Sequence, residues 1–209
     1  MAALPQTSLG WRLKPWQTIL LFGLLQTALI GVTTFFFDYF AGAATLGFAV
    51  WPKVGGTGLF YVYMIGYFNA LVVILPVLLL KRFGVGMAIY LPYALIGIPV
   101  DMLLDAGTLI SPWAAVGWGL VGLAAGLSVD LAYRYLPGHL TERTRAILMG
   151  IVLGAASFLL SLLAQAFFYR VSMPTDTGSF IGMAYFGVPW LLVTSAFGGY
   201  TAYAISRNA

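Results

Sequence analysis

Two carboxylates within apolar stretches, Asp101 and Asp130, are the side chains of this sequence best suited to contact a polar or charged group. Asp130 is followed four positions later by Arg134, and residues at that spacing share one face of a helix, so we expect a local ion pair. Asp101 has no basic residue three or four positions away. We therefore predict that Asp101 contacts a polar or cationic ligand. The alternative is a hydrogen bond to a neighbouring helix.

Aromatic and amide side chains accompany Asp101 in the same halves of the apolar stretches. Aromatic rings suit a flat heterocycle because stacking adds to apolar burial, and a few polar groups then fix its orientation. An amide that faced lipid would be costly, so Asn69 and Gln165 are expected to point into a bundle or a cavity. For any single Tyr or Trp the alternative is the aromatic belt at a membrane surface. The predicted ligand-binding residues are Tyr63, Tyr67, Asn69, Asp101, Trp113 and Gln165.

Patterns that carry catalysis or bind metals are missing from the sequence. It contains neither a GxxxxGK[ST] nucleotide loop nor a GxSxG nucleophile elbow. It has no Cys, and its single His, His139, lies in a connecting segment, which excludes zinc and haem sites of the usual kinds. The net charge of +4 comes without a basic cluster that could follow a nucleic-acid backbone. We expect no enzyme, no cofactor, no metal and no nucleic-acid partner.

Six long apolar segments must position these residues. Hydrophobic residues make up 61% of the chain and charged residues 8%, whereas a soluble domain carries about 25% charged residues. A helix that spans a bilayer needs roughly 20 mostly apolar residues. The sequence therefore predicts an all-α integral membrane protein, a single six-helix membrane domain over residues 1–209. The expected spans are 16–39, 59–80, 83–104, 108–136, 145–169 and 180–205.

The basic residues predict the orientation of this bundle in the cell membrane. Of the ten Lys and Arg, only Lys53 and Arg170 fall in connections on one side, and the others flank the opposite span ends. Because cytoplasmic loops carry the excess of Lys and Arg, both termini are expected in the cytoplasm. The outer connection 40–58 is apolar and rich in Gly. It is expected either to lie over the bundle as a lid or to form a short interfacial helix.

Small residues recur at four-residue spacing in several of the expected spans. Such stripes let helices approach closely, and we expect most of them, including Gly122 with Gly126 and Gly150 with Gly154, to be internal seams. The stripe of the first span is flanked by large apolar side chains, so it is either a seam or a docking face for a partner protein. The predicted docking residues are Gly23, Thr27 and Gly31.

The middle of the chain, about residues 60–165, resembles a known transporter family. The segments YMIGYFNALVVILPVLLLKRFGVGMAIYLPYALIGIPVDMLLD and AAVGWGLVGLAAGLSVDLAYRYL are similar in layout to hydroxymethylpyrimidine/thiamine-type substrate-binding (S) components of energy-coupling factor transporters. In that family a basic turn leads into a third helix with an acidic residue near its outer end, and a GLxxE-like segment closes the fourth helix. Asp101 and Asp130 match the acidic positions, with Asp in place of Glu.

The resemblance implies a function. An S component captures a vitamin-like molecule from outside and then topples in the membrane, driven by ATPase subunits on other chains through a transmembrane coupling protein. The stripe of the first span resembles the AxxxA-type surface that meets the coupling protein, although Gly23, Thr27 and Gly31 replace the alanines. The expected ligand is a small planar heterocycle such as a pyrimidine or a thiamine-like compound.

Two other functions fit the same pattern of spans. The first alternative is a non-catalytic integral subunit of a larger membrane enzyme complex, whose stripes and aromatic residues would contact neighbouring chains. The second is a channel or a stand-alone carrier. Tight binding of a small molecule by the purified chain distinguishes the S component from the accessory subunit.

Overall fold

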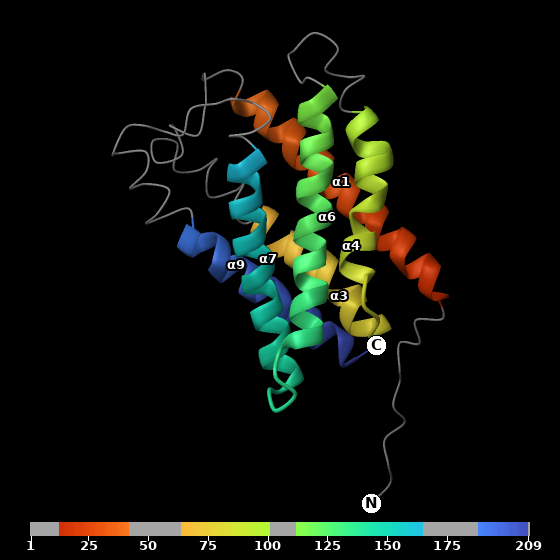
Figure 1. The fold of residues 1–209 in the computed structure, drawn as a ribbon, viewed down its shortest axis with the longest axis vertical. Coiled ribbons are helices and arrows are strands. Elements are labelled where there is room, and N and C mark those ends of the chain that lie inside the picture. The colour runs from red at the N-terminus through yellow and green to blue at the C-terminus, as the bar shows by residue number, and fades with distance from the viewer. Residues whose placement is uncertain (1–12, 42–63, 101–111, 165–187, 209) are drawn as a thin grey trace, which may run out of the picture.

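The computed structural model describes residues 13–41, 64–100, 112–164 and 188–208, and this part of the chain is helical with short turns (Figure 1). The all-α prediction is confirmed for these ranges, which contain no strand. The helices are α1 (Pro15–Ala41), η3 (Met64–Phe68), α3 (Asn69–Leu80), α4 (Val85–Ile89), η4 (Tyr93–Gly97), α6 (Pro112–Tyr135), α7 (Glu142–Ala164) and α9 (Val188–Ser206).

The central element is α3, which contacts α1, α4, α6, α7 and α9. Eight of its 12 residues are buried, from Asn69 to Val77. Val and Ile at successive positions make this helix apolar on every face, as expected for a helix surrounded by others. It ends at Lys81, whose left-handed conformation (φ 50°) closes the helix with a bond from its N–H to the Val77 carbonyl.

The third predicted span, 83–104, is not one regular helix over its described part. A turn at Tyr90 separates α4 from the following segment, which contains the π-helical turn η4. Pro92 lies between the two, and a proline removes an N–H and clashes with the carbonyl of the preceding turn, so a regular α-helix is interrupted there. The second span is also composite, with η3 leading directly into α3.

Glycines allow the helices to cross with backbone contact at two seams. A Cβ added to Gly126 on α6 would collide with the carbonyl of Gly86 on α4, and one added to Gly150 on α7 would collide with the carbonyl of Ser195 on α9. A Cβ on Gly154 would lie 2.7 Å from the Ser195 hydroxyl oxygen. The prediction that these stripes are internal seams is confirmed.

The basic residues gather at one end of the bundle. The first residues of α1, α4 and α7 and the last residues of α3, α6 and α9 all lie in the lower half of Figure 1. Every Lys and Arg of the described ranges belongs to these helix ends or to the residues beside them. We call this the basic end, defined by Lys14, Lys81, Arg82, Arg134, Arg143, Arg145 and Arg207.

One helix of the described ranges, Glu142–Leu160, is long and apolar enough by itself to cross a bilayer. Three shorter apolar segments accompany it: Pro15–Gly31, Gly66–Leu80 and Val85–Val100. Several predicted spans have an end outside the described residues. Of the predicted outer connection 40–58, residues 42–58 also lie outside them. The six-span topology therefore stays a prediction.

Candidate functional site

A polar cluster lies in the interior of the bundle at the start of α3. The Gln26 side-chain Nε2 donates a hydrogen bond to Asn69 Oδ1 at 2.7 Å, and the Tyr90 hydroxyl donates to the same oxygen at 2.6 Å. Gln26 is 1% exposed, Tyr90 4% and Asn69 9%. We call these three residues the amide cluster. It joins α1, α3 and the turn after α4 through side chains that are far apart in sequence.

The amide cluster contains a buried acceptor with no partner. The Gln26 Oε1 atom is inaccessible to solvent and accepts no hydrogen bond from the residues that the structure describes. Buried polar groups in folded proteins nearly always have a partner, and leaving one unpaired costs about 1–3 kcal/mol. A donor such as a ring N–H, an amino group or a water would remove this cost. The cluster can therefore bind by hydrogen bonding, and it offers no nucleophile.

Tyr67 and Asn69 were predicted to line one pocket, but their side chains contact different helices. The Tyr67 hydroxyl donates to Thr201 Oγ1 on α9 at 3.2 Å, and the Tyr67 ring packs edge-on against Phe68 with centroids 5.0 Å apart. Asn69 instead faces Gln26 on α1. Trp113 lies in α6, and its side chain is outside the described part. The other predicted ligand residues fall outside the described residues: Tyr63, Asp101 and Gln165.

The predicted ion pair between Asp130 and Arg134 is wrong. Asp130 is fully buried, and its two carboxylate oxygens accept hydrogen bonds from the backbone N–H groups of Gly86 and Met87, both at 2.9 Å. Arg134 instead lies over the rings of Phe83 and Tyr135, at 5.6 and 5.7 Å. The first N–H groups of a helix lack partners within it, so the N-terminus of α4 competes successfully for the carboxylate. These two hydrogen bonds therefore link α6, which contains Asp130, to the first turn of α4.

The predicted docking stripe on α1 has two different environments. A Cβ added to Gly23 would lie 2.6 Å from Pro92 Cγ, and one added to Gly97 would lie 3.1 Å from the Thr27 methyl group. These two positions meet the chain itself, whereas no described atom outside its own helix lies within 4 Å of a Cβ added to Gly31. The docking role stays a prediction. Within the described residues, Gly31 is the position of the stripe that leaves space for a partner helix.

Sequence reasoning missed two members of the amide cluster. Gln26 carried a usable signal, because an amide in the middle of an apolar span is as costly as Asn69 or Gln165, yet only those two were singled out. Tyr90 gave no signal that distinguishes it from the other tyrosines. Its role depends on the turn that places its hydroxyl beside Asn69.

In the ranges that the structure describes, no three His, Asp or Glu side chains gather into a group that could hold a metal ion. No protein-family model, curated protein or solved structure matches this chain. The likeness to S components thus rests on the sequence pattern alone and stays a prediction.

Proposed function

We propose that this chain is a multi-pass membrane protein whose interior captures a small planar heterocycle from the outer side. The distribution of side chains supports the membrane location. Polar residues are buried, among them Gln26, Asn69, Asp130 and Ser195, while large apolar side chains are exposed. The exposed apolar residues on the described part of α1 include Leu20, Leu21, Leu24 and Leu25, each 46–50% exposed. Soluble monomers rarely expose contiguous apolar faces, whereas lipid favours them.

The orientation of this proposal follows from the basic end. Basic residues mark the cytoplasmic side of membrane proteins, so the basic end faces the cytoplasm. Trp16 and Tyr135 lie at the same end and are 59% and 71% exposed, as interfacial anchors would be. Trp190 is 42% exposed near the start of α9, the end of that helix that lies away from the basic end.

The observation that best supports ligand capture is the buried Oε1 atom of Gln26. This side chain bonds to Asn69 through its Nε2, but its Oε1 has no hydrogen-bond partner among the described residues. The 12 residues of α3 separate Asn69 from the basic end, a rise of roughly 17 Å at 1.5 Å per residue. With a hydrocarbon core about 30 Å thick, the proposal has the cluster near the midplane and toward the outer half. A heterocycle that bears an N–H or amino group would pair with Gln26 Oε1.

The resemblance to S components supplies the rest of the proposal. The captured molecule is a pyrimidine or thiamine-like compound, and uptake is driven by a coupling protein and ATPase subunits on other chains. The chain itself performs no chemical conversion under this proposal. Binding comes from apolar burial, stacking and a few directed hydrogen bonds.

A binding screen on the purified chain tests ligand capture. Thermal unfolding in nonionic detergent is measured with thiamine, hydroxymethylpyrimidine and other planar vitamins, and the strongest stabiliser is taken to calorimetry. Gln26→Leu should weaken its binding by about 2-fold to 13-fold, the value of a neutral hydrogen bond. Gln17→Leu is the matched control, because Gln17 lies on the same helix and bonds to the N–H of Lys14. A folded protein that binds no compound of the panel would favour the accessory subunit instead.

Cysteine labelling tests the topology independently, and the absence of native Cys makes single-cysteine variants unambiguous. A membrane-impermeant maleimide should label Ser172→Cys in intact cells and should label Thr141→Cys only after the membrane is opened. Thr141 lies at the basic end, just before α7. Labelling of both positions from the same side would contradict the proposed orientation.

A further inference from the structure

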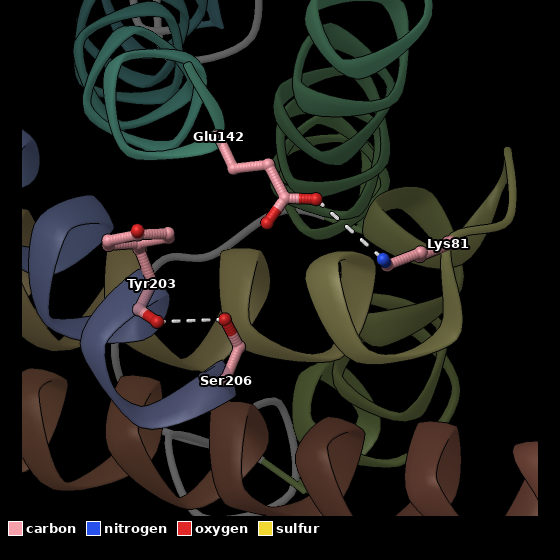
Figure 2. Close-up of polar contacts among 4 residues, drawn as sticks. All are labelled: Lys81, Glu142, Tyr203 and Ser206. Atoms are coloured by element: carbon pink, nitrogen blue, oxygen red, sulfur yellow. Dashed lines mark hydrogen bonds and ion pairs between the residues drawn. The ribbon is translucent and has the colours of Figure 1, made fainter. Parts of the chain in front are cut away.

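A polar cavity of about 110 Å³ opens among the helix ends of the basic end. Its wall comes from four places in the sequence: the end of α3 with the residue after it, the end of α6, the start of α7, and the end of α9 with the residue after it. The polar side chains that line it include Lys81, Tyr133, Glu142, Arg145, Ser206 and Arg207. We call it the inner cavity. Figure 2 shows four of the residues that line it, with Lys81 beside Glu142 and Ser206 beside Tyr203.

The inner cavity has an excess of positive charge. Three basic side chains, those of Lys81, Arg145 and Arg207, line it together with one carboxylate, that of Glu142. The Lys81 ammonium lies 3.7 Å from this carboxylate, and both side chains are about two-thirds exposed, at 67% and 68%. Exposed pairs of this kind contribute little stability, so Glu142 does not immobilise Lys81, and its carboxylate opposes three basic side chains with a single negative charge. Among the described residues neither Arg145 nor Arg207 forms an ion pair.

Two contacts fix the position of the Arg145 side chain, and its Nε donor takes part in neither of them. Its Nη2 donates to the Tyr133 carbonyl at 2.6 Å, and its guanidinium lies 5.4 Å from the centre of the Tyr133 ring. Its Nε is buried and has no hydrogen-bond partner in the described part of the chain. A guanidinium presents its N–H groups in a fork that matches the oxygens of a phosphate. The Ser206 hydroxyl donates to the Tyr203 carbonyl, so the basic side chains supply the donors for a ligand (Figure 2).

We propose that the inner cavity binds a phosphate group, carried either by the headgroup of an anionic lipid or by a soluble molecule. A single buried water needs only roughly 10–15 Å³, so a cavity of about 110 Å³ admits a phosphate with some of its water. Basic pockets between spanning helices on the cytoplasmic side are where anionic headgroups bind. A phosphate there would link the ends of α3, α7 and α9, because Lys81 follows α3 directly, Arg145 lies in the first turn of α7 and Arg207 follows α9 directly.

The test measures stabilisation and retention of two probes by the purified full-length chain. Phosphatidylglycerol and phosphatidylcholine are added to detergent micelles at equal amounts, and sodium phosphate is compared with sodium chloride at equal ionic strength. Thermal unfolding is followed by Trp fluorescence, and bound lipid is counted by native mass spectrometry. Binding of phosphatidylglycerol alone identifies a lipid as the source of the phosphate. Stabilisation by inorganic phosphate identifies a soluble source. Binding of neither probe overturns the proposal.

Charge-matched variants localise the effect to the cavity. Lys81→Gln with Arg207→Gln removes two basic side chains from the wall and should weaken binding by about tenfold or more. The control, Arg82→Gln with Arg143→Gln, removes the same charge from the same end at positions that do not line the cavity. Glu142→Gln removes the opposing carboxylate and should strengthen binding. Equal losses in the two double variants, or no gain in Glu142→Gln, would show general attraction to the basic end and overturn the proposal.

Discussion

Removal of the Asp130 carboxylate should destabilise the protein through the α4–α6 contact. Its oxygens accept two backbone hydrogen bonds of 2.9 Å from Gly86 and Met87 in a fully buried setting. In Asp130→Asn the amide oxygen can keep one of these bonds, and the NH₂ group then opposes the other N–H. The variant therefore loses one charge-assisted bond, a cost of about 1.5–3 kcal/mol in the free energy of unfolding.

This cost is measurable by SDS-induced unfolding of the purified protein, followed by circular dichroism. Arg134→Gln is the control, because Arg134 lies over the rings of Phe83 and Tyr135 and should contribute only about 0.5–1 kcal/mol. An ion pair between Asp130 and Arg134 would make the two losses similar. The reasoning is refuted if Arg134→Gln costs as much as Asp130→Asn, or if Asp130→Asn unfolds at the same SDS fraction as the parent.

Three further substitutions test the packing in the same unfolding assay. Gly126→Ala should lower the free energy of unfolding by about 1–3 kcal/mol, because its methyl group meets backbone atoms that have no room to move. Gly31→Ala, with nothing within 4 Å, should instead be neutral or stabilising by up to about 1 kcal/mol through helix propensity, and a loss there would contradict the open environment of this position. Thr27→Leu should destabilise the isolated chain by a similar 1–3 kcal/mol or so, since Thr27 packs near Gly97; an undisturbed fold with lost complex formation would support docking instead. Asn69→Ala should cost about 1–3 kcal/mol for each of the two donors it leaves unpaired, and a smaller loss would mean that water replaces the amide.

The class of the fold was predictable from the sequence because it depends on local properties. Apolar runs separated by basic turns predict helices whatever their neighbours are, and the positions of Lys and Arg along the chain predicted the basic end that the structure shows. Glycines at four-residue spacing likewise predicted seams, as at Gly126 and Gly150. The interruption around Pro92 also follows from a local cause, the missing N–H of proline, although it was not predicted.

The partners of the buried polar groups were decided only by the tertiary structure. Asp130 has a nearby base in sequence, yet the helix N-terminus at Gly86, 44 residues away, supplies its hydrogen bond. Gln26 and Asn69 are 43 residues apart, and no spacing rule along the chain relates them. The physical reason is that a sequence records which groups need partners in an apolar interior, whereas the crossing of helices determines which donors come within 3 Å of them. The inner cavity shows the same division, because its basic residues come from separate helix ends and form a site only when the bundle brings those ends together.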